Sequence, residues 1–308
     1  GSFDGSLRWW YPEAKPFDKL EWVSSSNIGG GYGTTAIAIA DAMKKEGLLK
    51  EYTVTYRANA PLGMTYFQEQ KGRKDLLAMT GFAMPGGLAT NGSKIQMIDF
   101  KAVAAVMREA EAIVVPNNSK FKTINDLLTA IKASPKSVAI GGGNYGGVDH
   151  VTIATLAAGQ GIAATDLNYI PYSGGATLVP DVISGRVAVG LAGTSEFASY
   201  VAAGKMKVLA LTSPKPLSVM KGRTLIQQGV QLTFGNWRGI LAPADLSDAD
   251  LLNTTKIFDE LHATQGWKDT LTAKSWIDDY RSGSNFTSWL KTENKNIIDV
   301  LTAFKLIK

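Results

Sequence analysis

The chain has 308 residues, of which 45% are hydrophobic, so it can bury a sizeable core and is long enough to form two lobes. Its 32 basic and 27 acidic residues give a net charge of +5, and no run of like charges marks a nucleic-acid-binding arm. The absence of cysteine excludes disulfides, thiolate zinc sites and cysteine nucleophiles. No apolar stretch approaches the length of a membrane-spanning helix, and Gly1-Ser2 is interpreted as a trimmed start, as removal of a signal peptide would leave.

The first part of the chain repeats one pattern, which is a β-rich run followed by a glycine cluster and a helical pattern. It predicts strands at residues 21–26, 52–56 and 76–80, and helices at residues 34–45 and 64–70. The glycine-containing segments between them are residues 29–33, the turn at residues 59–63, and Gly81. We expect a βαβαβ unit from this alternation.

A second series of the same kind follows. Strands are predicted at residues 112–115, 137–140, 167–171, 186–191 and 207–211, and helices at residues 124–133, 148–158 and 195–203, with another helix ending near Gly185. Thr123 is the predicted cap of the first of these helices, and Pro180 predicts a start or a kink in the helix that ends near Gly185. The alternation predicts mainly parallel sheets with helices on both faces. Residues 247–308 are predicted to be helical, with core positions at Trp267, Trp276 and Trp289.

The glycine clusters all follow predicted strands and precede predicted helices. In open parallel sheets ligands bind at this edge, where helix N-termini offer unpaired N–H groups and partial positive charge, and glycine lets an anion approach the backbone. Anion capture is therefore one interpretation, and tight turns without a ligand are the other. ATP and NAD are poor candidates, because no cluster continues into Gly-Lys-Ser/Thr and the cluster at residues 29–33 lacks the dinucleotide spacing.

No catalytic or metal-binding constellation is found. His150 and His262 lie in segments predicted to belong to different lobes, and there is no Gly-x-Ser-x-Gly elbow. Ser119 and Lys122 match Ser-x-x-Lys, but the partner motifs of that hydrolase pattern are missing. We therefore expect no enzyme activity, no cofactor and no metal.

Several segments, taken in order, carry a family resemblance. They are GGG at residues 29–31, GGGNYGGVDH at 141–150, YSGG at 172–175, AGKMKVLALTS at 203–213 and FGNWRGILAP at 234–243, followed by a tail with Trp267, Trp276 and Phe286. This ordered set resembles the solute-binding proteins of tripartite tricarboxylate transporters, the Bug-type periplasmic receptors. The resemblance extends from about Trp22 to the end of the sequence.

The resemblance implies an α/β type II periplasmic-binding-protein fold, with two lobes around a central cleft. The lobes would be residues 1–109 with 220–308, and residues 110–219, with crossings near 108–112 and 215–222. It also implies a periplasmic protein, expected to be a monomer, that captures a dicarboxylic, tricarboxylic or aromatic acid and delivers it to membrane transporter subunits, without nucleic acid. A receptor that presents its ligand to a membrane sensor, and an enzyme acting on an anionic substrate, are the alternatives.

Carried over residue by residue, the resemblance predicts a ligand site from loops of both lobes. Its members are Gly29, Gly30, Gly31, Tyr32, Gly33, Thr34, Thr35, Thr80, Gly81, Asn144, Tyr145, Gly146, Gly147, Asp149, His150, Tyr172, Ser173, Gly174, Gly175, Ser195 and Glu196. The chain departs from most members of the family at residues 32–40, where they carry an acidic residue and then an arginine, and at residues 61–65, where they carry a more glycine-rich run.

Four side chains keep two interpretations each. Asp149 and His150 either stabilise the end of their helix or contact the ligand. Arg238 either forms a structural ion pair near the lobe junction or clamps a carboxylate, for which its planar guanidinium is well suited, and Arg57 leaves the same choice open. Neither arginine is a primary site residue in this prediction.

Overall fold

The structure of the chain is a computed structural model that describes residues 13–307, so the predicted trimmed start at residues 1–2 lies outside the described residues. The strands are β1 (Phe17–Ser24), β2 (Leu49–Tyr56), β3 (Leu76–Gly81), β4 (Lys101–Val115), β5 (Ala139–Gly142), β6 (Asn168–Pro171), β7 (Val189–Gly193), β8 (Lys207–Leu211), β9 (Gly235–Ala242) and β10 (Arg281–Ser282). The helices are α1 (Gly31–Lys45), α2 (Ala60–Glu69), α3 (Ala83–Thr90), α4 (Ile124–Ala133), α5 (Val148–Ala158), α6 (Gly175–Ile183), α7 (Thr194–Ala202), α8 (Asp248–Ala263), α9 (Gln265–Lys274) and α10 (Gly283–Ala303).

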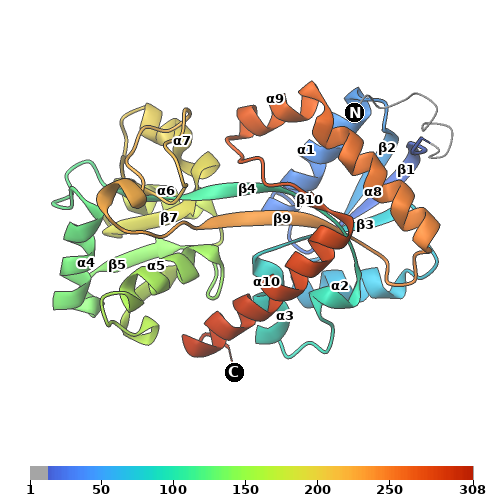
Figure 1. Ribbon diagram of the computed structural model, residues 1–308. Coiled ribbons are helices and arrows are strands. Elements are labelled where there is room, and N and C mark those ends of the chain that lie inside the picture. The colour runs from blue at the N-terminus through green and yellow to red at the C-terminus, as the bar shows by residue number, and fades with distance from the viewer. Residues whose placement is uncertain (1–12, 308) are drawn as a thin grey trace.

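The strands form a mixed sheet in the order β2-β1-β3-β9-β4-β7-β5-β6, with β8 and β10 also paired to β4. β1 pairs in parallel with β2 and β3, and β5 pairs in parallel with β6 and β7, as the βα alternation predicts. β4 and β9 are antiparallel to their neighbours and to each other. These two strands were not predicted as a ribbon, and they run between the two bodies of the molecule in Figure 1.

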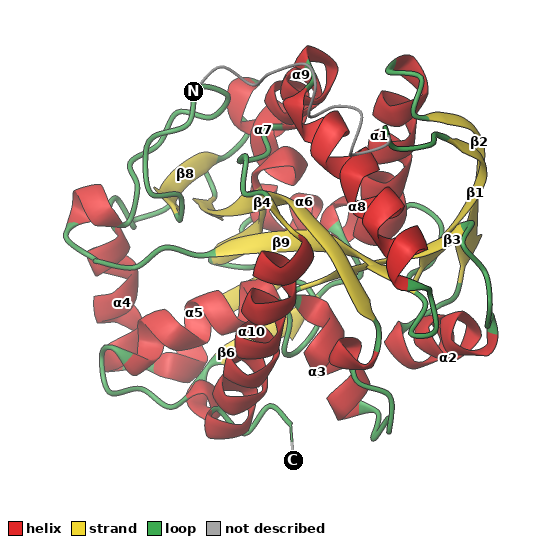
Figure 2. Ribbon diagram, turned by 45° about the vertical axis from the view of Figure 1, so that its right-hand side comes forward, coloured by secondary structure: helices red, strands yellow, loops and turns green. Residues whose placement is uncertain are grey.

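We call these two bodies the first lobe, with β1, β2, β3, α1, α2, α3, α8, α9 and α10, and the second lobe, with β5 to β8 and α4 to α7. Helices lie on both sides of the strands, and β4 and β9 pass between the lobes (Figure 2). The family's two-lobed α/β architecture, expected from the sequence, is therefore confirmed. Within residues 13–307 no helix combines the length and apolar content that crossing a membrane requires.

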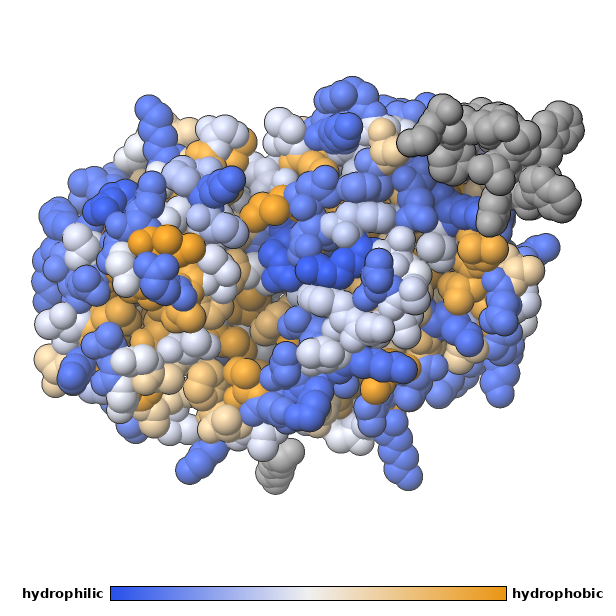
Figure 3. All heavy atoms as spheres, viewed as in Figure 1, coloured by the Kyte–Doolittle hydropathy of each residue, from blue (hydrophilic) through white to orange (hydrophobic). Residues whose placement is uncertain are grey.

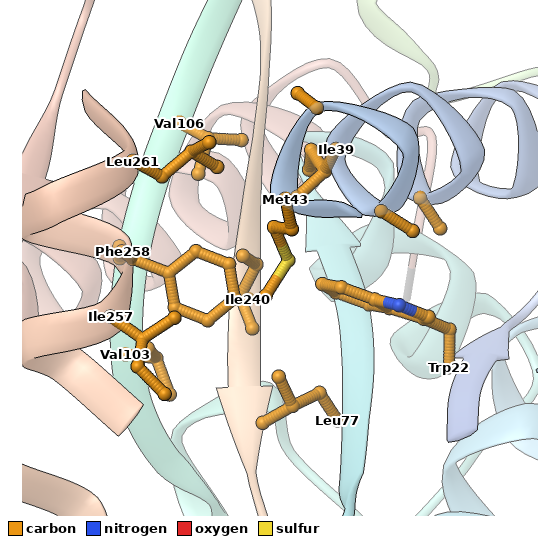
Figure 4. Close-up of a cluster of buried hydrophobic side chains, with 14 of the residues drawn as sticks. Trp22, Ile39, Met43, Leu77, Val103, Val106, Ile240, Ile257, Phe258 and Leu261 are labelled. Atoms are coloured by element: carbon orange, nitrogen blue, oxygen red, sulfur yellow. The ribbon is translucent and has the colours of Figure 1, made fainter. Parts of the chain in front are cut away.

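Each lobe has its own hydrophobic core. In the first lobe Trp22, Met43 and Phe258 are fully or almost fully buried, and they pack in one cluster with side chains of β3, β4 and β9 (Figure 4). The rings of Trp22 and Phe258 meet edge to face at 6.2 Å. Each such side chain contributes about 1.5–3 kcal/mol through its removal from water, which holds α1 and α8 together on one face of the sheet.

The second core lies under α4 and α5. Ile113 and Leu191 are completely buried there, and Leu225 packs in the same cluster although it follows β8 in the chain. α4 begins as predicted, because the Thr123 side chain accepts a hydrogen bond from Asp126 N and the Asp126 carboxylate accepts one from Thr123 N.

Two segments differ from their predicted local structure. Asn59 does not belong to a turn of the kind predicted at residues 59–63, because its side chain accepts a hydrogen bond from Leu62 N at 3.0 Å and so caps α2. Gly31 to Gly33 are not loop residues but the first turn of α1. The α2 segment was read as a turn because it contains proline, which is also favoured at the first positions of a helix, and the α1 segment was read as a loop because of its glycines.

The helix α10 connects the lobes from one side. Its first half packs in the first lobe through Phe286 and Leu290, and its second half forms a small cluster in which Ile297 and Leu301 contact Val151 of α5. In the view of Figure 3, hydrophobic residues gather on the second lobe toward the middle of the molecule. The end of α10 therefore contacts both lobes.

Candidate functional site

The first helix of the chain presents an N-terminus without any acidic residue. Gly30 precedes α1 in an extended conformation, no side chain caps the helix, and its first turn contains no Asp or Glu. The hydroxyls of Thr34 and Thr35 donate back to the carbonyl of Gly31, at 3.1 and 2.8 Å, and do not occupy the N–H groups of the first turn. These N–H groups, with the partial positive charge of the helix end, are suited to an anion.

Arg238 lies directly at this helix end. It stands on β9 opposite Gly81 of β3, and its Nη1 donates a hydrogen bond to Thr35 Oγ1 at 3.0 Å. A Cβ at Gly31 would collide with Nη2 of this arginine, so the close approach requires glycine. Within residues 13–307 Arg238 forms no ion pair with a carboxylate. The structure therefore gives no support to the structural ion pair that was one of its two sequence interpretations.

Tyr32 completes the surroundings of this arginine. Its hydroxyl is buried and has no hydrogen-bond partner among the described residues. Burial raises the pKa of this phenol above its usual range, and the nearby positive charge of Arg238 opposes that shift. The phenol therefore stays protonated at neutral pH and can donate a hydrogen bond to a group that enters beside Arg238.

The ribbon of β4 and β9 carries charged side chains on one face. Paired residues of neighbouring strands point to the same side, and Arg238 is paired with Met107 while Asn236 is paired with Glu109. Since side chains alternate along a strand, Glu111 lies on the same face. Arg108 points to the other face and forms an ion pair with Asp279 at 2.8 Å. The shared face is basic toward the first lobe and acidic toward the second.

In the second lobe, carboxylates of the chain itself occupy the helix starts. Glu109 Oε1 accepts a hydrogen bond from Ser195 N at 2.8 Å in the first turn of α7. The Glu196 carboxylate accepts one from Gly175 N at the start of α6. Asp149, in the first turn of α5, accepts one from Gly143 N at 2.8 Å. These helix ends are already neutralised, unlike that of α1.

The acidic side chains of this lobe also influence one another. Burial raises the pKa of Glu111 well above its usual range, with a further contribution from Asp149, and burial likewise raises the pKa of Asp149. The pKa of Glu196 is raised by partial desolvation and then by Glu109 and Asp149, while Arg238 opposes the shift. Glu111 and Asp149 hydrogen-bond to each other only when one of them holds a proton, so the pair shares one.

The second predicted loop is held by its own residues. Gly146 N donates to His150 Nδ1 at 3.0 Å, and the imidazole ring is buried and stacks on the Tyr169 ring at 4.1 Å. Burial lowers the pKa of His150 to about 4, so the ring is neutral and its Nε2 carries the proton. Together with the bond from Gly143 to Asp149, these contacts favour the helix-end interpretation of Asp149 and His150.

The predicted site residues fall into separate groups. Gly31, Tyr32, Thr35 and Gly81 surround Arg238. Ser195 lies beside the Glu109 carboxylate, and Gly175 lies beside the Glu196 carboxylate. Asn144, Tyr145, Gly147, Gly174 and Ser173 remain at partly or fully exposed positions of their loops.

Two predicted side chains point elsewhere. Thr80 is completely buried and its hydroxyl contacts Met97 Sδ at 2.9 Å, while Tyr172 donates to Asp181 Oδ2 at 2.5 Å. Arg57 is exposed, and its guanidinium lies over the Tyr66 ring at 4.5 Å. The hydroxyls of Thr80 and Tyr172 are therefore engaged within the protein, whereas the Arg57 side chain is not buried.

Sequence reasoning did not single out Glu109 and Glu111, and it left Arg238 outside the primary site residues. The signal was present, because two glutamates at alternate positions interrupt the apolar run of residues 102–115. Charged residues at that spacing in a buried strand share one face and require partners. Two surface hollows, of about 360 and 380 Å³, lie beside α10 and beside Phe67, and neither includes a predicted site residue.

The fold and the positions of the strand ends define a two-lobed α/β binding protein. The family model "Tripartite tricarboxylate transporter family receptor" matches residues 90–285, which is more than half of the chain, and the chain belongs to this family. The membership predicted from the sequence is thereby confirmed, and the family is one of solute-binding receptors. No group of three or more histidine or acidic side chains within residues 13–307 is arranged to hold a metal ion.

Relatives of known sequence and structure agree with this. A UPF0065 protein from the tcbD-tcbE intergenic region of Pseudomonas sp. strain P51 is 28% identical over 205 residues, covering 65% of the chain and 60% of that relative's length. A TctC solute-binding protein from Polaromonas is 20% identical, with a TM-score of 0.73 and coverage of 93% and 99% of the two chains. MatC from Rhodopseudomonas palustris with bound malate is 15% identical, with a TM-score of 0.75 and coverage of 93% and 99%. An R. palustris protein with adipate is 17% identical, with a TM-score of 0.78 and coverage of 94% and 98%.

Proposed function

We propose that this protein is a periplasmic solute-binding protein that captures a small carboxylate and delivers it to a tripartite tricarboxylate-type membrane transporter. The single observation that supports the ligand class most directly is Arg238, which has no carboxylate partner among the described residues and lies at the acid-free start of α1. A guanidinium and a helix N-terminus together recognise a carboxylate through charge-assisted hydrogen bonds. The solved relatives that hold malate and adipate support the same class.

In this proposal the carboxylate sits between Arg238, the first turn of α1 and the hydroxyl of Tyr32. Gly31 and Gly81 leave space for the arginine side chain, since a Cβ at either position would approach it closely. The loops at residues 144–150 and 172–175 and the start of α7 provide the facing wall. The backbone of these loops, more than the side chains of Asp149 and His150, would contact the ligand.

The division of the chain is part of the proposal. We keep the first crossing near residues 108–112, and this is supported by the course of β4 from the first core at Met107 to the second at Ile113. We place the return crossing in β9, after Phe234, and not at residues 215–222 as predicted, because Leu225, Val230 and Phe234 pack against the second core. The lobes would then be residues 1–109 with 235–308, and residues 110–234.

The ligand class can be tested by thermal unfolding with a panel of small molecules. Carboxylates such as succinate, malate and adipate should stabilise the protein, by about 2.7 kcal/mol at a hundredfold excess over the dissociation constant, whereas their diamides and neutral sugars should not. Stabilisation by sugars together with no response to any carboxylate would end this proposal.

The position of the site can be tested with Arg238→Met. Loss of charge-assisted hydrogen bonds costs about 1.5–3 kcal/mol, so we expect affinity for a bound carboxylate to fall roughly ten- to a hundredfold in calorimetry. The control is Arg223→Met, an exposed arginine of the second lobe whose Nη2 donates to a backbone carbonyl, and its affinity should match the wild type. Equal affinity in all three proteins would place the carboxylate elsewhere.

A further inference from the structure

The polar face of the β4–β9 ribbon has opposite charges at its two ends. Arg238 lies at the first-lobe end, and Glu109 is paired with Asn236, two residues further along β9. Two residues of a strand span about 7 Å, so a small molecule that touches Arg238 also reaches the acidic end. Glu196 follows Ser195 in the first turn of α7, and Ser195 N donates to Glu109 Oε1 at 2.8 Å, so Glu196 belongs to the same acidic end of the ribbon.

The acidic end lacks a cation. Glu109 and Glu111 are 5% and 1% exposed, and together with Asp149 and Glu196 they form no ion pair with lysine or arginine within residues 13–307. Glu111 Oε2 is buried and receives no hydrogen bond from an N–H or hydroxyl group of the described residues. The proton that Glu111 and Asp149 share is one donor among four carboxylates. Buried carboxylates are normally paired, so this end still lacks a positively charged partner.

The missing group is not a metal ion held by protein side chains, because no cluster of three or more suitable ligands exists within the described residues. A second ligand carboxylate would also fit poorly, since it would face Glu109 and Glu196 and repel them. An ammonium group is compact and offers three N–H donors to carboxylates.

We propose that the ligand is a small carboxylate that also carries a cationic amine, with its carboxylate at Arg238 and α1 and its ammonium group at Glu196 and Glu109. This inference rests on the proposed function, because it takes the anion site at Arg238 as given. It narrows the ligand class from carboxylates in general to aminocarboxylates. The charges of such a ligand are complementary to the ribbon face at both ends.

The test compares ligands of equal length by thermal unfolding and calorimetry at about pH 7.5. Each set contains an aminocarboxylate, the same acid without its amine, and the diacid of the same chain length. Examples are 4-aminobutyrate with butyrate and succinate, and glutamate with glutarate, and the series covers α- and ω-amino acids of two to six carbons. We expect the tightest aminocarboxylate to bind at least tenfold more tightly than both of its matched acids.

The outcomes separate this inference from the proposed function. If a diacid binds as tightly as the matched aminocarboxylate or more tightly, the inference is wrong and carboxylate capture still stands. If neither aminocarboxylates nor plain carboxylates bind, both this inference and the proposed function are wrong. Binding of simple amines without a carboxylate, at equal affinity, would overturn the placement at Arg238.

A variant tests which residues hold the amine. Glu196→Gln keeps an acceptor for Gly175 N but removes the charge, and we expect at least a tenfold loss of affinity for the aminocarboxylate with the affinity for the matched plain acid kept or increased. The matched control is Glu260→Gln, an exposed glutamate of α8, which should leave both affinities unchanged. An equal loss for both ligands in Glu196→Gln, or no loss for either, contradicts the inference.

Discussion

The partial positive charge at the helix N-termini is compensated by acidic side chains in the second lobe but not at α1 in the first lobe. In the second lobe α5, α6 and α7 begin beside carboxylates of the chain, those of Asp149, Glu196 and Glu109. In the first lobe α1 begins with no acidic residue, and Arg238 adds a further positive charge there. The βα alternation is the same in both lobes, so the fold alone does not decide where an anion binds. The placement of a few acidic side chains does.

Gly31 of the first lobe and Gly146 of the second are required for different reasons. Gly31 has no positive φ angle and is required because Arg238 occupies the space of a Cβ, whereas Gly146 has a φ of 78° and is required by its backbone conformation. Gly31 therefore allows a close contact between the backbone and a side chain, whereas Gly146 allows a backbone conformation that other residues rarely adopt. Substitutions at these positions therefore have different meanings.

The largest effect on the first lobe is expected from Gly31→Ala. The new methyl group must displace the Arg238 guanidinium, so carboxylate affinity should fall by up to about a hundredfold, which corresponds to about 2.7 kcal/mol. Stability without ligand should change little, because the displaced group is the flexible end of a side chain. Calorimetry and thermal unfolding measure the two quantities.

Gly266→Ala is the matched control for this substitution. Gly266 lies in the first turn of α9, and a Cβ there would meet the flexible end of Glu46, far from the ribbon. Its affinity should equal that of the wild type. If both variants lose affinity alike, the close approach of Arg238 to Gly31 is irrelevant to binding.

The contact between His150 and the loop at residues 143–147 should make the stability of the protein depend on pH. Because burial lowers the pKa of His150 to about 4 from an unfolded value near 6.5, the unfolded state binds a proton that the folded state excludes. Stability from this group is therefore lost as pH falls from about 6.5 toward 4, by about 2 kcal/mol between pH 7 and pH 4.5. Denaturant unfolding of the wild type and of His150→Asn at both pH values measures the difference.

Asparagine can still accept the hydrogen bond from Gly146 N, and the buried carboxyl groups titrate in both proteins, so their opposite contribution cancels in the comparison. We expect the variant to lose about 2 kcal/mol less than the wild type on acidification. Identical losses would mean that His150 is protonated in the folded protein.

The smallest effect on affinity and stability should come from placing an acidic residue in the first turn of α1, as α5 and α7 of the second lobe have. Thr34→Glu places a carboxylate in the first turn of α1, which should stabilise the ligand-free protein by about 0.5 kcal/mol through the helix dipole and weaken carboxylate binding severalfold. Gln265→Glu in the first turn of α9, which also lacks an acidic residue, should give a similar gain without loss of affinity. Tighter carboxylate binding by Thr34→Glu would contradict the assignment of the anion site to α1.

Local signals predicted much of the fold. α4 and α5 begin and end where the sequence patterns place them, because a capping box and a glycine run define those starts within a few residues. The antiparallel β4–β9 ribbon was not predicted, since its register depends on pairing between segments more than a hundred residues apart. The return crossing that we propose in β9 differs from the predicted one for the same reason.

The site was predictable to the extent that it is made of backbone. The glycine clusters located the first turn of α1 and the loop at residues 143–147. The role of Arg238 could not be decided from the sequence, because it depends on which carboxylates the fold brings to the guanidinium. The same holds for Glu109 and Glu111, whose partners lie on two other elements, α5 and α7.

The bridging end of α10 has a practical value for measuring motion. Leu301 packs with Val151 of the second lobe, while Leu290 of the same helix is held in the first-lobe core. Any separation of the lobes must break one set of these contacts and expose apolar side chains to water. Val300 is next to Leu301 and 36% exposed, so it can carry an environment-sensitive dye without replacing a core residue. The fluorescence of such a dye would follow opening and closing in real time, with no substitution near the ligand.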